Sequence, residues 1–300
     1  MTTFGSFCSG IEAASIAFMP LGWEPAFYSE IEDFPIAVLK YRHAARDLRI
    51  GRAAGTVPLW GDMAAMRVRH LKRFGIEMPD VLIAGTPCQG FSLAGLRGSL
   101  SDARSNLALT FVRIAHAIDH VREREGKSGL IVVWENVPGV LTTGDNAFGC
   151  FLGGFVGADD PLVPPDAIWG PLPHFDDRSY NVHRTYGWQS CRWPSEGLAE
   201  GPRARAAWRV LDAQYFGLAQ RRERVFAVIC FRDAADPAAI LFERLGLRGN
   251  SPPRREARKD IAPTIAARAS GGGGLGTDSD CDGGLVTREA SHCLNGGGHG

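Results

Sequence analysis

The first half of the chain alternates short apolar runs with longer stretches of helical periodicity, and this alternation constrains the fold more than any other feature. The strand-like runs are Thr3–Phe7, Ala26–Tyr28, Val81–Ala84 and Leu130–Trp134, and the helix-like stretches are Ala13–Leu21, Ala37–Arg42 and Leu107–Arg122. In the last stretch the apolar residues recur at the spacing of one helix face. Alternating strands and helices favour an α/β fold with a doubly wound, mostly parallel sheet.

Small or polar residues follow the strand-like runs at several places. They are Ser9–Gly10, Glu30, Asp62, Cys88 and Glu135. The carboxyl ends of parallel strands meet at one edge of a sheet, and ligands of open α/β sheets bind beyond that edge. We therefore expect these residues to lie at a common functional site.

The second half is less regular. Residues 139–201 are rich in Gly, Pro and Trp, and we interpret them as surface loops. Strand-like runs return at Ala207–Ala213 and Arg224–Phe231, whereas the last forty residues are glycine-rich and polar. This composition predicts loop structure in a small, irregular C-terminal region.

Composition narrows the function only a little. The formal net charge is +0, although basic residues outnumber acidic ones about two to one between Arg203 and Arg268. That segment fits either an anionic partner or a solvated face. The seven cysteines are odd in number and widely spaced without C-x-x-C, so neither disulfides nor a metal site is expected. Without a signal peptide or a membrane-length apolar run, we expect a cytoplasmic protein with no membrane partner.

The sharpest motif is Gly85-Thr86-Pro87-Cys88-Gln89-Gly90, which follows a buried strand. A lone cysteine is most often a small buried hydrophobic residue. Here the cysteine follows a proline at a strand end, in a loop flanked by glycines, and that setting favours a nucleophile.

A second motif is Trp134-Glu135-Asn136-Val137-Pro138. A carboxylate at the end of an apolar strand is either a helix cap or an acid/base group in a cleft. Asn136 is able to serve as a cap by itself. Because Cys88 and Glu135 follow two strands at the same edge, they are expected to converge on one substrate.

The succession of Pro-Cys-Gln at 87–89, Glu-Asn-Val at 135–137 and Gln-Arg-Arg-Glu-Arg at 220–224 resembles the DNA (cytosine-5) methyltransferase family, most closely its phage and prophage members. The resemblance runs from about Phe4 to Phe231. It implies a Rossmann-like methyltransferase fold, S-adenosylmethionine as methyl donor, and double-stranded DNA as partner. It also implies a flipped target cytosine and a role in restriction-modification or phage DNA self-protection.

The resemblance assigns the chemistry to four residues. Cys88 would add to carbon 6 of cytosine, and Glu135 would bond ring N3 and the exocyclic amine. Arg224 would hold the cytosine O2, and Arg222 would support it or contact a phosphate. The acceptor of the proton on carbon 5 is not identified.

The donor site implied by the resemblance begins with Cys8, Ser9, Gly10 and Ile11, which match the family's F-x-G-x-G loop. This chain departs from that pattern at two positions, with Cys8 for the phenylalanine and Glu12 for the second glycine. The other implied donor contacts are Glu30 for the ribose hydroxyls, Ile31 for the adenine face, Asp62 for the adenine amine, and Pro87 and Leu107.

The DNA contacts implied by the resemblance lie in two segments. Residues 92–104 resemble the loop that closes over the flipped base, and Arg97 and Arg104 are candidate DNA contacts there, as is Gln89 just before the loop. Arg221 is a fourth candidate. A solvated surface arginine is the alternative for Arg97 and Arg104.

Two later family blocks, R-E-x-x-R-L-Q and G-N-[AS]-[VI], are not found. We therefore expect residues 1–231 to form the catalytic domain and residues 232–300 to begin an incomplete target-recognition region, in a fragment of a longer enzyme or one half of a split enzyme. The alternatives are a tRNA cytosine-5 methyltransferase, a non-catalytic DNA-binding relative, and an unrelated cysteine hydrolase. The hydrolase would need a histidine partner for Cys88, and none of His43, His70, His116 or His120 follows a strand convincingly.

Overall fold

A computed structural model describes residues 1–51, 53–87, 107–143, 145–171, 186–217 and 220–242. The chain divides into two compact units. One comprises Met1–Leu211 with Glu223–Gly246, and the other comprises Asp212–Arg222 with Leu247–Gly300. Each unit is described by itself.

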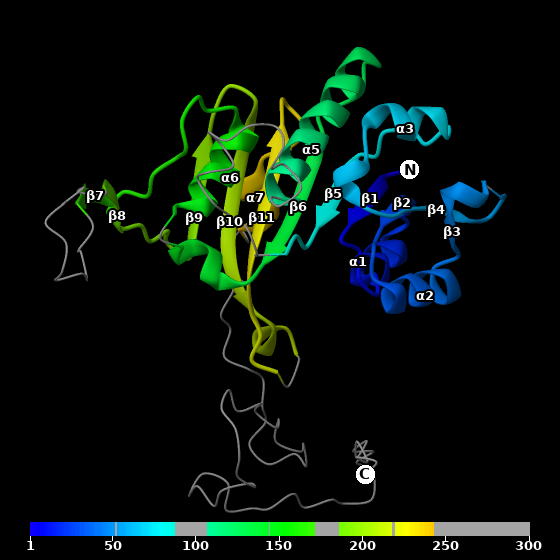
Figure 1. Cartoon of the computed structure of the whole chain (residues 1–300), viewed down its shortest axis with the longest axis horizontal. Coiled ribbons are helices and arrows are strands. Elements are labelled where there is room, and N and C mark those ends of the chain that lie inside the picture. The colour runs from blue at the N-terminus through cyan, green and yellow to red at the C-terminus, as the bar shows by residue number, and fades with distance from the viewer. Residues whose placement is uncertain (52, 88–106, 144, 172–185, 218–219, 243–300) are drawn as a thin grey trace, which may run out of the picture. The chain divides into compact units, whose positions relative to one another are not determined.

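The described part of the first unit is built on a sheet of nine strands in the order β3-β4-β2-β1-β5-β6-β11-β10-β9 (Figure 1). Its strands are β1 Thr3–Phe7, β2 Glu24–Ser29, β3 Ala45–Asp47, β4 Val57–Trp60, β5 Val81–Ala84, β6 Ile131–Asn136, β9 Glu196–Glu200, β10 Ala204–Asp212 and β11 Glu223–Phe231. The strands from β3 to β6 are parallel, and β11 runs antiparallel to β6. A separate hairpin joins β7 Ile168–Pro171 and β8 Tyr186–Ser190.

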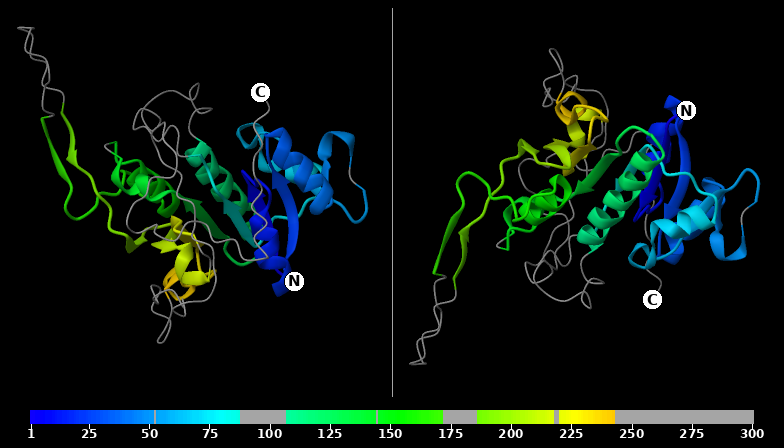
Figure 2. Two further views of the ribbon diagram at one scale, coloured as in Figure 1. Left: turned by 90° about the horizontal axis from the view of Figure 1, so that it is seen from below. Right: turned by 90° about the horizontal axis from the view of Figure 1, so that it is seen from above.

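Helices cover both faces of this sheet. The α-helices are α1 Ala13–Phe18, α2 Asp33–Arg42, α3 Val68–Arg73, α5 Leu107–Arg124, α6 Ala147–Val156 and α7 Pro237–Leu241. The 3₁₀ turns are η1 Met19–Leu21, η2 Leu48–Ile50, η3 Met63–Ala65, η4 Pro138–Thr142 and η5 Ala213–Phe216. Figure 2 shows α5 and α6 on one side of the strands and α7 on the other.

The core is split by the sheet into two clusters, as the alternation of side chains along each strand requires. Phe4 and Tyr28 pack with Leu39 of α2 on one face. Phe7 and Leu82 pack with α5 and α6 on the other face. The predicted doubly wound, mostly parallel α/β fold is therefore confirmed.

The interpretation of residues 139–201 as surface loops is wrong for α6, which is a buried helix. Its glycines lower helix propensity, and they misled the interpretation of the sequence. They are needed for close packing, because a Cβ at Gly149 would lie 2.0 Å from the Leu162 carbonyl oxygen. Tertiary contact thus outweighs local propensity in this segment.

Several boundaries also differ from the sequence-based expectation. β6 extends to Asn136, so Glu135 lies within the strand rather than after it. The elements β3, β4 and α3 were not predicted. Among the described residues, no helix combines the length and apolar character that crossing a bilayer requires.

Candidate active site and donor pocket

The segment that leads from β5 toward Cys88 is fastened to β6 by two side-chain hydrogen bonds. Trp134 Nε1 donates to Thr86 Oγ1 at 2.8 Å, and Asn136 Nδ2 donates to the Thr86 carbonyl oxygen at 2.8 Å. Thr86 and both of its partners are buried. The backbone through Thr86 is thereby held against β6, and Pro87 carries the chain on to Cys88, which lies outside the described residues.

The Glu135 carboxylate lies between this segment and β11. A Cβ on Gly85 would lie 3.3 Å from Glu135 Oε2, a tight approach that explains why a residue without a side chain is suited to position 85. On the other side, Arg224 Nε pairs with Glu135 Oε1 at 2.9 Å. The Glu135 side chain is 33% exposed, so it is paired with Arg224 and still reaches the surface.

The antiparallel pairing of β11 explains how Arg224 reaches Glu135. Phe226 is the register partner of Glu135, and Val225 is the partner of Asn136. The beginning of β11 therefore lies beside the carboxyl end of β6, on the opposite side of β6 from β5. Two of the residues expected to act together, Glu135 and Arg224, are brought together by the described structure.

Asn136 does not act as the helix cap considered from the sequence. Its Oδ1 accepts from the Val137 backbone N–H at 2.8 Å, while its amide nitrogen binds Thr86. Nor does Glu135 cap the following turn, η4, whose N-cap residue is Val137. Thr86, Trp134 and Asn136 are site-building residues that sequence reasoning missed, although all three flank the motifs it identified.

Two further predicted arginines lie in the second unit. Arg221 and Arg222 are both exposed in the segment Asp212–Arg222. Within that segment Asp212 Oδ1 accepts from the backbone N–H groups of Gln214 and Arg222, which closes the turn. Of the other DNA-contact candidates, Gln89, Arg97 and Arg104 lie outside the described residues.

The predicted donor loop connects β1 to α1. The backbone N–H of Gly10 donates to Glu30 Oε2 at 2.7 Å. Cys8, Gly10 and Glu12 all have positive φ, which places alternate residues of the loop in the left-handed region. Ile11, at the tip of the loop, has an exposed side chain. The loop is thus a tight turn that is tied to the end of β2.

Glu30 and Asp62 are anchored by backbone amides. Glu30 Oε1 accepts from the N–H groups of Ile31 at 2.7 Å and Glu32 at 3.0 Å. Asp62 Oδ1 accepts from the N–H of Ala64 at 2.8 Å. A carboxylate offers about four acceptor positions. Glu30, with three N–H donors in all, therefore has about one position left.

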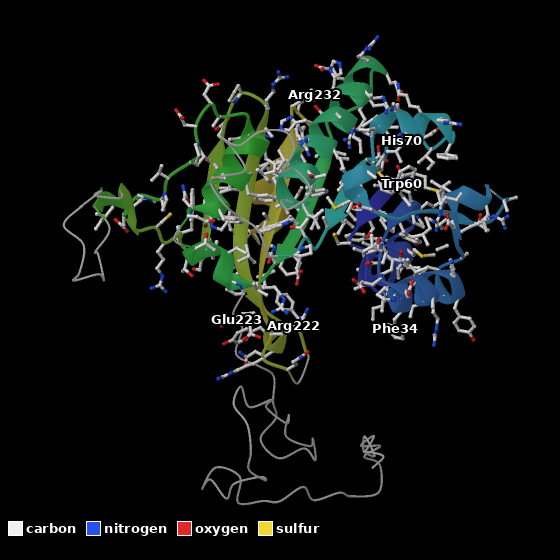
Figure 3. All side chains as sticks on the ribbon, in the orientation of Figure 1. Phe34, Trp60, His70, Arg222, Glu223 and Arg232 are labelled. Carbon is white, nitrogen blue, oxygen red and sulfur yellow. The ribbon has the colours of Figure 1, made fainter. Side chains whose placement is uncertain are left out.

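A pocket of about 590 Å³ lies against Glu30, Ile31 and Asp62. Its wall also includes Trp60, whose ring stacks on His70 with centroids 5.0 Å apart (Figure 3). Three predicted donor residues therefore share one cavity. Sequence reasoning missed Trp60 and His70, which belong to two elements, β4 and α3, that it did not predict.

The other predicted donor residues do not line this pocket in the described part of the chain; they are Cys8, Ser9, Gly10, Ile11, Pro87 and Leu107. Leu107 instead packs against the core. Cys8 Sγ donates to Met63 Sδ at 3.7 Å. Burial, followed by the charges of Glu30 and Asp62, raises the pKa of the Cys8 thiol to about 12, so Cys8 is an uncharged thiol at physiological pH.

The described residues contain no group of three His, Cys, Asp or Glu side chains arranged to hold a metal ion. What they do contain is a mostly parallel α/β sheet whose carboxyl edge carries a nucleotide-sized pocket and a paired carboxylate and arginine. This arrangement is that of a Rossmann-like α/β protein with two groups of polar residues at the carboxyl edge of its sheet.

Comparison with known proteins gives the family. The model of the C-5 cytosine-specific DNA methylase family matches residues 2–152. The chain belongs to this family, which confirms the resemblance seen in the sequence. The match includes Glu30, Asp62 and Glu135 and ends before Arg224.

The relatives add detail. The chain is 47% identical over 269 residues to a protein of Escherichia phage P1 named DNA N-6-adenine-methyltransferase, covering 89% of this chain and 33% of that protein. It is 30% identical over 202 residues to the type II methyltransferase M.HpaII of Haemophilus parainfluenzae, covering 64% of this chain and 49% of that one. The chain thus spans one third to one half of the length of these relatives.

Among solved structures, a DNA modification methyltransferase encoded within a prophage of E. coli is similar. It matches with a TM-score of 0.46 and 16% identity, over 78% of this chain and 47% of that chain.

Proposed function

We propose that this protein transfers a methyl group to carbon 5 of cytosine in DNA, with Cys88 as covalent nucleophile. One observation carries the proposal: the segment that runs directly into Cys88 is fastened to β6 beside Glu135, and Glu135 is paired with Arg224 at 2.9 Å. A carboxylate and a guanidinium group held on either side of a strand end can grip the polar edge of one base.

The chemistry requires these groups because carbon 5 of cytosine is a poor nucleophile. A thiolate from Cys88 adds to carbon 6 and gives an enamine-like ring, in which carbon 5 carries the electron density needed for attack. Glu135 bonds N3 and the exocyclic amine and stabilises the charge that develops during addition. Arg224 holds the O2 atom. Carbon 5 attacks the methyl carbon of the donor, whose sulfonium sulfur leaves as a neutral thioether. Loss of the proton on carbon 5, followed by β-elimination, then frees Cys88.

The donor we propose is S-adenosylmethionine, which supplies an electrophilic methyl group when bound. The pocket is large enough for an adenosine moiety, and its residues offer matching chemistry. Asp62 would accept from the adenine amine, and the exposed Ile31 side chain would cover one adenine face. Glu30 would accept from a ribose hydroxyl at its remaining position.

The partner we propose is double-stranded DNA in a bacterial or phage-infected cytoplasm, in restriction-modification or phage DNA self-protection. Carbon 6 is inaccessible within stacked duplex DNA, so the cytosine must be flipped out. Arg221 and Arg222 are exposed cations suited to phosphate contact. Arg97, Arg104 and Gln89 are proposed for the same role on the sequence alone.

The test is covalent trapping with a duplex that contains 5-fluorocytosine, in the presence of S-adenosylmethionine. Fluorine cannot leave as a cation, so the adduct persists and migrates as a protein–DNA band under denaturing conditions. Cys88→Ser should abolish the band, while Cys150→Ser, at a buried cysteine of α6, should leave it intact. An adduct that survives Cys88→Ser would contradict the nucleophile assignment.

A second candidate function is methylation of the adenine N6 atom, and the name of the phage P1 relative favours it. That name describes a protein about three times as long as the stretch matched here. The adenine amine can attack a methyl donor directly, so this reaction requires no cysteine adduct. Methylation of adenine that is unaffected by Cys88→Ser would support it. Methylation of tRNA in preference to duplex DNA would instead favour the RNA alternative.

A further inference from the structure

The donor loop contains a glutamate where the family pattern has glycine. Glu12 has φ 67° and ψ 60°, the left-handed conformation that glycine adopts without cost and that a residue with a Cβ adopts only when it is held. Glu12 therefore adopts a backbone conformation that favours glycine. Glu12 is only 1% exposed, so the contacts of its buried side chain must stabilise this backbone conformation.

One carboxyl oxygen of Glu12 is an acceptor only. Glu12 Oε1 accepts from the Ser15 backbone N–H at 3.1 Å and from the Ser15 hydroxyl at 3.3 Å. The Ser15 hydroxyl lies 2.9 Å from the Tyr28 hydroxyl of β2. If Ser15 donates to Glu12, Tyr28 must donate to Ser15, so the chain of hydrogen bonds ends on Oε1.

The other carboxyl oxygen of Glu12, Oε2, differs from Oε1 in its hydrogen bonding. Glu12 Oε2 has no hydrogen-bond partner among the described residues. The nearby Ser9 hydroxyl has its one hydrogen directed at the carbonyl oxygens of Ser6 and Ser29 and also accepts from the Ser29 N–H. A proton on Oε2 would suit these surroundings, whereas a buried unpaired charge would be costly.

We propose that Glu12 is a positioning residue that holds the donor loop in its binding conformation as a neutral carboxylic acid, and that ionisation of Glu12 releases the loop. The inference rests on the proposed donor site. The loop bonds at risk are Glu12 N–H to the Ser9 carbonyl oxygen at 2.9 Å and Gly10 N–H to Glu30.

The titration of Glu12 agrees with this geometry. Burial raises the pKa of Glu12 above its ordinary value, and the hydrogen bonds from Ser15 together with the nearby hydroxyl groups of Ser6 and Ser9 offset this only in part. A raised folded-state pKa means that the contribution to stability is full below the ordinary pKa. It is lost as the pH rises through the raised value.

The neighbouring titratable groups do not mimic this effect. Burial raises the pKa of Tyr28 to about 12, and the pKa of Cys8 is likewise raised to about 12, so both stay neutral while Glu12 titrates. Glu30, at the end of β2, binds the Gly10 N–H of the same loop. The effect of Glu30 on donor affinity is the same in all variants at position 12, so it cancels when their affinities are compared.

The decisive experiment compares the full chain with Glu12→Gln, which replaces the acid by an amide that has the same acceptor and keeps a donor. Binding of S-adenosylmethionine is measured by calorimetry from about pH 4 to pH 10, so that the range begins near the ordinary pKa of a glutamate, with Glu24→Gln, at an exposed site on β2, as control. Wild-type and control affinities should fall about tenfold per pH unit above the pKa of Glu12. Glu12→Gln should match the wild-type affinity at low pH within about threefold and lack this fall.

Two results would overturn the inference. One is a wild-type profile that parallels that of Glu12→Gln. The other is a loss of affinity in Glu12→Gln of about tenfold or more at every pH, which would mean that the carboxylate acts as a charge. If Glu12→Gln fails to fold, Glu12→Gly provides the family residue and should bind without the alkaline loss.

A second readout does not depend on the donor. Thermal unfolding of the wild type should move to lower temperature with rising pH relative to Glu12→Gln, and parallel curves would contradict the inference. Failure of the wild type to bind the donor at any pH would instead count against the proposed function, and the unfolding curves would still decide the role of Glu12.

Discussion

The two parts of the candidate site are held in different ways. At the edge formed by β5, β6 and β11, buried side chains hold the backbone in place, because Trp134 and Asn136 donate hydrogen bonds to Thr86. At the edge formed by β1, β2 and β4, backbone amides fasten the side chains, most clearly the three N–H groups on Glu30. The apolar residues of this second edge, Ile11 and Ile31, are 59% and 61% exposed.

This difference suits the two tasks we propose. A nucleophile must meet one ring atom within a fraction of an ångström, so the backbone that presents it needs rigid support. A donor that enters and leaves with every turnover needs an open pocket with fixed acceptors. The following predictions separate the two parts by what each substitution should damage.

The largest effect is expected for Glu135→Gln. The substitution removes the charge that stabilises the addition step, and methylation should fall by about 10²- to 10³-fold. Stability should change by less than about 1 kcal/mol, because the ion pair with Arg224 is partly exposed. Initial rates with a tritiated methyl donor measure the first quantity, and urea denaturation measures the second.

The matched control for Glu135→Gln is Glu196→Gln. Glu196 pairs with Arg209 at 3.3 Å between β9 and β10, away from the proposed chemistry. Its substitution should leave the rate unchanged. Equal rates for wild type and Glu135→Gln would remove Glu135 from the mechanism.

A smaller effect is expected for Glu30→Ala. Loss of a charge-assisted hydrogen bond to the donor costs about 1.5–3 kcal/mol, or roughly 10- to 100-fold in affinity. Calorimetric titration with S-adenosylmethionine measures it, and the exposed Glu32→Gln serves as control. Donor affinity equal to that of the wild type would mean that the pocket has another occupant.

Thr86→Val tests the fastened edge. The substitution keeps the shape of the side chain but leaves the buried Trp134 Nε1–H without its acceptor. The fold should lose about 1–3 kcal/mol, measured by chemical denaturation. Thr86→Ser retains the hydroxyl and should retain most of this stability. If both variants are equally stable, the hydrogen bond does not support the segment.

The smallest effect is expected at Cys8. With its pKa near 12, the thiol should resist alkylation by iodoacetamide at about pH 8.5, and Cys8→Ser should leave donor affinity within about twofold. Peptide mass spectrometry after timed alkylation measures its reactivity. Rapid labelling of Cys8 at that pH would contradict the buried, neutral thiol.

Much of the parallel sheet could be predicted from the sequence, because β1, β5 and β6 are apolar runs long enough to be recognised. The expectation that Glu30 and Asp62 follow strand ends is confirmed, since β2 ends at Ser29 and β4 ends at Trp60. Helix α6 could not be predicted, because its glycines are justified by tertiary contacts, including those of Gly149 with Leu162 and of Gly154 with Val112, which lies far from it in the chain.

In the site, too, the motifs could be predicted from local sequence patterns, whereas the contacts between residues far apart in the chain could not. The motifs around Glu135 and Thr86 are visible in the sequence, but the hydrogen bond between Thr86 and Asn136 joins residues 50 positions apart. The pairing of Glu135 with Arg224 depends on β11 running antiparallel to β6, which no local pattern encodes. The role of Cys88, which lies outside the described residues, stays a prediction.

The measurement that tests the central claim most directly is the identity of the methylated base. DNA treated with the full chain and S-adenosylmethionine is digested to nucleosides and analysed by mass spectrometry, alongside DNA treated with Cys88→Ser. The account predicts 5-methylcytosine with the wild type and none with the variant. N6-methyladenine as the product, or 5-methylcytosine formed without Cys88, would contradict it.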